Sequence, residues 1–224
     1  EINFKDANMS RSTFTDVFGF IYAVAFSPDG RLLAAGTIDG RIRLWSMATQ
    51  QPVGSLEGHA EAVWSIAFSP DGETLVSGGL EGVINLWKVS EMKLFGQLKG
   101  HQAGIHSVVF SPNGRTLASS SSDRTIRLWD VSQRQPLQIF RGHTNNVQAV
   151  AFAPNGETLA SGSRDQTVRL WNLNSGVKCQ TLRGHNSWIY ALAFSPDGQT
   201  LASASEDGTI CVWDIPAISQ TRNL

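Results

Sequence analysis

Apolar residues along the chain fall into short runs separated by turn-forming residues. In the stretch from Val147 to Leu182, the apolar run 147–152 is followed by the turn sequence Ala-Pro-Asn-Gly at 153–156. The segments 158–163, 167–172 and 177–182 then carry small, branched or alternating apolar and polar residues. Alternation with a period of two indicates a half-buried strand, and Pro and Gly favour a tight turn. The pattern therefore predicts four short β-strands and no helix in this stretch.

The same pattern recurs along the chain at a spacing of 42 residues. Tryptophan occurs at this interval at Trp45, Trp87, Trp129, Trp171 and Trp213. Phenylalanine does so at Phe26, Phe68, Phe110, Phe152 and Phe194, and Gly-His precedes four of the units at Gly58-His59, Gly100-His101, Gly142-His143 and Gly184-His185. A constant period of this length, with four strands in each unit, is typical of propeller blades. Five units are predicted.

These motifs resemble those of the WD-repeat β-propeller family. The Gly-His pair, the Ser-Pro-Asp-Gly turn and the Trp-Asp ending at Trp129-Asp130 and Trp213-Asp214 carry the resemblance. The other units end in Trp45-Ser46, Trp87-Lys88 and Trp171-Asn172, and the resemblance extends from residue 16 to about residue 215. It implies an all-β fold of five four-stranded blades.

The resemblance also implies that a strand near the N-terminus completes the last blade. Leu56, Leu98, Phe140 and Leu182 mark the fourth strands, and Phe14 stands 42 positions before the first of them. We therefore expect residues 10–15 to pair with the third strand of the fifth unit. This divides the chain into a linker (1–9), the propeller (10–215) and a C-terminal tail (216–224). The alternatives to a closed five-bladed ring are a larger ring with missing repeats and completion by a second copy.

In the family, a His, a Ser or Thr, an Asp and the Trp of one blade form a hydrogen-bonded chain. By that resemblance the structural quartets are His101, Ser121, Asp123 and Trp129; His143, Ser163, Asp165 and Trp171; and His185, Ser205, Asp207 and Trp213. Buried polar groups need such partners. In the second unit Gly79 and Glu81 stand at the serine and aspartate positions, and in the first Val17 stands at the histidine position. We expect both units to lack a complete network and to exchange their amide hydrogens faster.

Ser, His and Asp are also the ingredients of a nucleophilic triad, and histidines can bind a metal ion. The set recurs in three units, however, whereas an active site needs one copy. The histidines are distributed one to a blade and should not converge on one ion. The sequence therefore favours a structural role, no catalytic residue, no metal site and no cofactor.

Partner contacts in the family lie near the start of each blade's first strand. Transferring those positions by register gives the candidate partner-binding residues Phe20, Tyr22, Ile38, Trp64, Leu80, Arg164, Trp188 and Tyr190. In a closed ring the fifth, first and second units would be neighbours and would bring the apolar members into one sector. Exposed aromatic clusters are typical of interface hot spots. The alternative is that these rings pack inward over the channel mouth.

The composition narrows the classes of partner. The 18 Lys and Arg residues nearly balance the 19 Asp and Glu residues, which gives no basic surface for nucleic acid or an anionic membrane. The chain has only two cysteines, Cys179 and Cys211, which favours a reducing cytoplasm over a disulfide framework.

The expected function is a non-catalytic scaffold or sensor that binds a protein or peptide. Phe4, Met9 and Phe14 recur every five residues, which resembles the stretch before the C-terminal propellers of cyanobacterial NB-ARC-type signalling ATPases. A small-ligand or glycan-binding propeller is the alternative, and a propeller hydrolase is less favoured because the acidic residues lie mostly in turns. Self-association is expected if the ring is incomplete.

Overall fold

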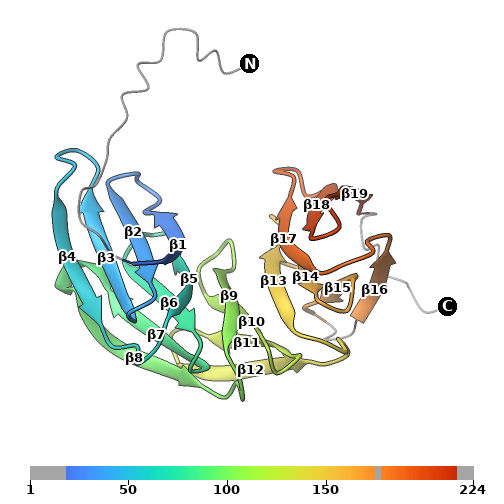
Figure 1. The fold of residues 1–224 in the computed structure, drawn as a ribbon, viewed down its shortest axis with the longest axis horizontal. Helices are drawn as coiled ribbons and strands as arrows, with labels where there is room; N and C mark the ends of the chain where they lie inside the picture. Colours follow the sequence, from blue (N-terminus) through green and yellow to red (C-terminus); the bar gives the residue numbers. More distant parts are fainter. Residues whose placement is uncertain (1–18, 175–177, 216–224) are drawn as a thin grey trace, which may run out of the picture.

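The computed structural model describes residues 19–174 and 178–215, which form five antiparallel β-sheets in chain order (Figure 1). The first four sheets have four strands each, and three strands of the fifth are described. The sheets, which we call blades 1 to 5, consist of β1 (Ile21–Phe26), β2 (Leu32–Thr37), β3 (Arg41–Ser46) and β4 (Pro52–Glu57); β5 (Val63–Phe68), β6 (Thr74–Gly79), β7 (Val83–Lys88) and β8 (Lys93–Lys99); β9 (Ile105–Phe110), β10 (Thr116–Ser121), β11 (Ile126–Asp130) and β12 (Gln135–Phe140); β13 (Val147–Phe152), β14 (Thr158–Ser163), β15 (Thr167–Asn172) and β16 (Lys178–Arg183); and β17 (Ile189–Phe194), β18 (Thr200–Ser205) and β19 (Ile210–Asp214). A 3₁₀ turn, Val89–Glu91, precedes β8, and the described residues contain no α-helix.

The turn between the first and second strands of a blade is fixed by its own side chains. In blade 2 the Ser69 hydroxyl donates to Asp71 at 2.5 Å, and Asp71 accepts the backbone N–H of Glu73 at 2.9 Å. Gly72 adopts a φ of +74°, a conformation that few other residues accept. Ser27 and Ser195 make the equivalent hydrogen bonds in blades 1 and 5. The repeated turn sequence therefore explains the repeated hairpin.

Neighbouring blades pack face to face through apolar residues at repeated positions. Leu44 and Leu56 of blade 1 share a buried cluster with Val63, Leu75 and Trp87 of blade 2. Corresponding clusters join blades 2 and 3, 3 and 4, and 4 and 5. A blade cannot bury both of its faces by itself, so stacking supplies the core.

The described blades form an open arc with blade 1 at one end and blade 5 at the other (Figure 1). Among the described residues, β19 pairs with β18 alone, whereas β3, β7, β11 and β15 each also pair with a fourth strand. The expected closing strand at 10–15 lies outside the described residues, as do the linker 1–9 and the tail 216–224. The structure shows the all-β blade architecture and leaves the expected closure as a prediction.

Candidate functional site

The quartet of blade 3 is a continuous hydrogen-bonded chain through the blade. The indole N–H of Trp129 donates to the Ser119 hydroxyl at 2.8 Å, and the same oxygen lies 2.8 Å from Nε2 of His101. Nδ1 of His101 lies 2.8 Å from the Asp123 carboxylate. A neutral imidazole with its proton on Nδ1 satisfies both ends of this chain. The histidine, aspartate and tryptophan are therefore those that the sequence predicted.

The serine of the chain is not the predicted one. The serine that contacts the histidine is Ser119 rather than Ser121 in blade 3. It is Ser161 rather than Ser163 in blade 4, and Ser203 rather than Ser205 in blade 5. The two serines of each strand are two residues apart and share one side of it. The earlier serine is level with the imidazole, whereas the later one ends the strand. There Ser121 donates to the Ala103 carbonyl at 2.9 Å and accepts the Asp123 N–H at 3.0 Å.

Blade 2 has a complete quartet, contrary to the sequence expectation. Trp87 donates to the Ser77 hydroxyl at 2.8 Å, and Ser77 lies 2.6 Å from Nε2 of His59. Glu81 then takes the place of aspartate, with Oε1 2.5 Å from Nδ1 of His59. Gly79 does not affect this hydrogen-bonded chain, because it corresponds to Ser121, the serine that ends the second strand of blade 3. The extra methylene of glutamate is accommodated, so the network persists.

Blade 1 departs from the quartet at the serine position. Ala35 stands where the later blades have Ser77, Ser119, Ser161 and Ser203, so this position carries no hydroxyl. Val17, the residue at the histidine position, lies outside the described residues. Thr37 and Asp39 nevertheless form the hydrogen bond that orders the turn.

Burial and hydrogen bonding determine the charge of the quartet acids. Burial disfavours ionised Asp123, but the hydrogen bonds from His101 and Thr125 outweigh it and hold the pKa of that carboxyl well below its ordinary value. The same balance, with His143 and Thr167, lowers the pKa of Asp165. Burial also lowers the pKa of His59, against the opposing effect of Glu81. The lowered pKa favours a neutral His59 imidazole between the Ser77 hydroxyl and the Glu81 carboxylate in blade 2.

This geometry holds the blade together through side chains that already have partners. The hydroxyls of Ser77, Ser119 and Ser161 belong to fully buried residues and already bind a tryptophan and a histidine. No set of three or more His, Cys, Asp or Glu side chains in the described ranges is arranged to hold a metal ion. This hydrogen-bonded chain fixes the loop before the first strand of each blade to the turn after its second strand.

A second set of contacts links four blades where their first strands begin. The Trp64 ring stacks on the His106 ring with a 4.9 Å separation and a 10° interplanar angle. Nε2 of His106 lies 2.7 Å from the Ser122 hydroxyl, to which the Asn146 amide donates at 3.2 Å. These contacts connect blades 2, 3 and 4.

The same set continues into blade 5. The backbone N–H of Arg164 donates to the Asn146 carbonyl at 2.9 Å, and the Arg164 guanidinium carbon lies 4.2 Å from the centroid of the Trp188 ring. Trp188 in turn meets Tyr190 edge to face at 6.3 Å. We call the seven residues the cross-blade row: Trp64, His106, Ser122, Asn146, Arg164, Trp188 and Tyr190.

The structure divides the eight candidate partner-binding residues between the ends of the arc. Phe20, Tyr22 and Ile38 are exposed on blade 1, and Leu80 is exposed beside Trp64 on blade 2. Arg164, Trp188 and Tyr190 lie on blades 4 and 5, at the other end (Figure 1). The described residues do not bring the two groups into one sector. His106, Ser122 and Asn146 bridge them, and the register that gave the other candidates also marks these positions.

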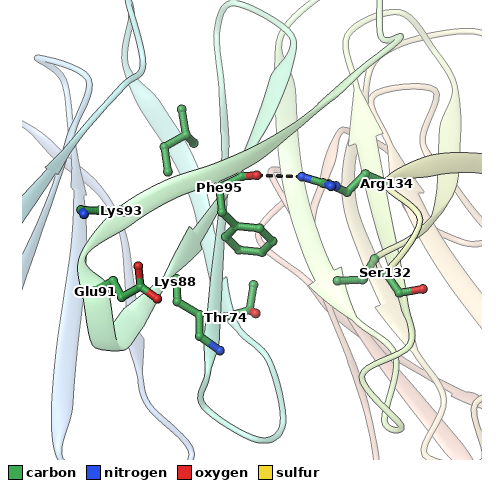
Figure 2. A pocket seen from close by; sticks show the side chains of 9 residues that line it. Thr74, Lys88, Glu91, Lys93, Phe95, Ser132 and Arg134 are labelled. Atoms are coloured by element: carbon green, nitrogen blue, oxygen red, sulfur yellow. Dashed lines mark hydrogen bonds between the residues drawn. The ribbon is translucent and has the colours of Figure 1, made fainter.

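A shallow hollow of about 540 Å³ lies between blades 2 and 3, away from the row (Figure 2). Phe95 and Arg134 face each other there, and the Arg134 guanidinium donates to the Phe95 carbonyl at 2.8 Å. Thr74 begins β6 and Lys88 ends β7, so the hollow is at the opposite strand ends from Trp64. It is an open feature of the rim.

Family comparisons agree with the repeated β-blade fold. Residues 134–172 and 176–214 match the WD domain, G-beta repeat family. Residues 11–123 match the first β-propeller family of WD repeat-containing protein 75. The chain belongs to the WD-repeat β-propeller family. In the described residues, no helix has the length and apolar character needed to cross a membrane.

Individual relatives match over short stretches. The chain is 48% identical over 54 residues to the uncharacterized WD repeat-containing protein alr3466 of Nostoc sp., covering 24% of this chain and 4% of that protein. It is 42% identical over 63 residues to the Nostoc protein alr2800, covering 28% and 5%. The general transcriptional corepressor TUP1 of Saccharomyces cerevisiae is 37% identical over 60 residues, covering 27% and 8%. The chain thus spans a small part of these relatives. WD repeats generally mediate protein–protein interaction, and their proteins are generally non-catalytic.

Proposed function

We propose that the chain is a scaffold or sensor module that binds a protein or peptide partner through the cross-blade row. The observation that carries this proposal is the continuity of the row, in which aromatic and polar side chains contact one another across four blades. Rigid aromatic rings joined by arginine are the typical anchors of protein interfaces. Their mutual contacts hold them in place before a partner arrives, which lowers the entropy cost of binding.

The row suits a partner segment with apolar side chains and a nearby carboxylate. Trp188 and Tyr190 offer ring surface, and Arg164 is fixed above Trp188 as a cation. Phe20, Tyr22, Ile38 and Leu80 extend the apolar surface on blades 1 and 2. Sites for a glycan in every blade would require shared side chains at these positions, whereas the row residues differ from blade to blade.

The wider setting is part of the same proposal. The matches to Nostoc proteins favour a bacterial origin, and the free Cys211 suits a reducing cytoplasm. The balanced charge disfavours nucleic acid or an anionic membrane as the partner. Within a larger regulatory or signalling protein, such as an NB-ARC-type ATPase, the module would recognise the signal or the target.

The test is affinity capture from an extract of the cells that make the chain. The variant Trp188→Ala with Tyr190→Ala is compared with the chain itself and with Leu94→Ala plus Leu137→Ala, which removes two exposed apolar side chains from β8 and β12. The row variant should bind the captured partner more than about tenfold more weakly than the unchanged chain, and the control should bind it with unchanged affinity. Equal retention by all three proteins, with unchanged circular dichroism, would contradict the proposal.

A further inference from the structure

The hollow between blades 2 and 3 has an aromatic ring at its centre and polar side chains around it. Phe95 of β8 is 41% exposed, and its ring points into the hollow (Figure 2). Lys88 and Thr74 border the ring on one side, and Ser132 and Arg134 border it on another (Figure 2). The volume of about 540 Å³ lies within the range of ligand-binding sites.

Contacts between the two blades fix the wall of this hollow. The Arg134 guanidinium donates to the Phe95 carbonyl at 2.8 Å. Arg134 also lies close against β8 because Gly96 has no side chain there: a Cβ on Gly96 would stand 2.7 Å from Cδ of Arg134. The backbone of Phe95 and the side chain of Arg134 therefore hold each other in place before a ligand arrives, which lowers the entropy cost of binding.

The cations of the hollow are found at this junction and not at the corresponding positions of its neighbours. Three cations line it, namely Lys88, Lys93 and Arg134. At the junction of blades 1 and 2 the residues at these positions are uncharged: they are Ser46, Gln51 and Met92. At the junction of blades 3 and 4 the counterparts of Lys88 and Lys93 are Asp130 and Gln135. The positive charge is therefore a specific feature of this hollow rather than a property of the repeat.

The acids near the hollow leave this positive charge largely in excess. Among the described residues that line the hollow, Glu91 is the one acid. Glu73, just outside it, pairs with Lys88 at 2.8 Å, and the two side chains are 66% and 37% exposed. Such an exposed ion pair contributes little stability, so Lys88 is able to exchange Glu73 for the carboxylate of a ligand.

We propose that the hollow is a second docking site, which binds a linear protein segment with an apolar side chain next to an aspartate or glutamate. The apolar side chain packs on the Phe95 ring, and the carboxylate pairs with Arg134 and Lys88. The charge of the hollow is complementary to such a segment, and arginine beside an exposed ring is typical of interface anchors. The site lies at the opposite strand ends from Trp64 and does not depend on the cross-blade row.

The test is fluorescence anisotropy with labelled peptides of defined chemistry. The probe is the peptide Asp-Glu-Leu-Phe-Asp-Glu. Lys-Lys-Leu-Phe-Lys-Lys reverses its charge, and Asp-Glu-Ala-Ala-Asp-Glu removes its apolar side chains. The acidic apolar peptide should bind the chain at least about tenfold more tightly than either control. Equal binding of the acidic apolar and acidic alanine peptides would show a general anion patch and overturn the proposal, and so would tighter binding of the basic peptide.

Two variants that borrow residues from blades 1 and 2 locate the peptide. Phe95→Val and Arg134→Met introduce the residues that the chain already has at the corresponding positions, Val53 and Met92. Met92 lies against Gly54 as Arg134 lies against Gly96, so both variants should retain the circular dichroism spectrum and the melting temperature of the unchanged chain. Each should bind the acidic apolar peptide about tenfold more weakly.

Two further variants serve as controls. Leu137→Ala removes the exposed apolar side chain that corresponds to Phe95 in blade 3, and Trp188→Ala with Tyr190→Ala removes the rings of the cross-blade row. Both should bind the peptide as the unchanged chain does. The proposal is overturned if the unchanged chain binds none of the peptides, or if Phe95→Val and Arg134→Met bind as well as the unchanged chain. It is also overturned if the row variant alone loses binding, since the peptide then binds at the row.

Discussion

Glu81 binds His59 as aspartates bind the corresponding histidines of blades 3 to 5. Its Oε1 lies 2.5 Å from Nδ1 of His59, and its Oε2 accepts the backbone N–H groups of Ala60 and Glu61 at 2.8 and 3.1 Å. One carboxylate thus fixes both the imidazole and the loop that carries it. Blade 2 has the same internal restraint as its successors, and blade 1 is the blade whose quartet is interrupted, at Ala35.

Hydrogen exchange should therefore separate blade 1 from blade 2. Amides of β6 and β7 should be protected as strongly as those of β10 and β11, and amides of β2 and β3 should exchange faster. Ile21, Val24 and Phe26 on β1 are also exposed, which adds to the expected exchange rate of blade 1. Measurement by mass spectrometry on the native chain gives the order directly.

The variant Glu81→Ala provides the matched comparison. Removing the carboxylate leaves the buried imidazole and two backbone N–H groups without their acceptor, so β6 and β7 should become as exchangeable as β2 and β3. Unchanged protection of blade 2 in this variant would show that the quartet does not stabilise the blade.

Stability should decrease as the pH falls from about 6.5 towards 4. Burial lowers the pKa of His106 from its ordinary 6.5 to about 4, with a further contribution from Arg164. The unfolded chain therefore binds a proton in this range that the folded chain refuses, and acid favours unfolding. The depressed pKa values of Asp123 and Asp165 act in the same direction, below about 3.8.

Substitution of the histidine isolates its contribution. His106→Phe retains a ring against Trp64 but cannot bind a proton, so its free energy of unfolding should depend less steeply on pH between 6.5 and 4. Urea unfolding at a series of pH values measures the slope. Identical slopes for the two proteins would exclude His106 as a source of the pH dependence.

Gly79 should not tolerate a side chain. A Cβ at this position would collide with the backbone carbonyl oxygen of Ala62, which cannot move independently of its strand. Gly79→Ser restores the residue type of the later blades, yet we expect it to destabilise the fold by about 2 kcal/mol or more. Chemical denaturation measures the loss of unfolding free energy, and a variant more stable than the unchanged chain would contradict the expected collision with Ala62.

Periodicity was enough to predict the five units and their strands, and the family resemblance implied most quartet residues. The histidine after glycine, the aspartate before the third strand and the tryptophan that ends this strand recur at constant offsets in the last three repeats, so their positions were unambiguous. The serine was not, because Ser119 and Ser121 face the same side of one strand and only their depth relative to His101 distinguishes them. Glu81 in place of aspartate predicts an incomplete network, whereas its carboxylate makes the same contact with His59.

The cross-blade row was less accessible to sequence reasoning. Contacts such as Trp64 with His106 and Arg164 with Trp188 join residues of different blades. Their meeting depends on the angle between blades, which no local pattern encodes. The grouping of blades 5, 1 and 2 rested on a closed ring, whose closing strand lies outside the described residues. The exposed positions were therefore predictable and their neighbours were not.

The central claim is that the repeated polar quartets stabilise the blades. Ser119 and its neighbour Ser120 test it, because both are 0% exposed, yet only the Ser119 hydroxyl has hydrogen-bond partners among the described residues. The free energy of unfolding should fall by about 2 kcal/mol or more in Ser119→Ala, where two buried groups lose their partner, and should hardly change in Ser120→Ala. Equal stability of the two variants would contradict the claim.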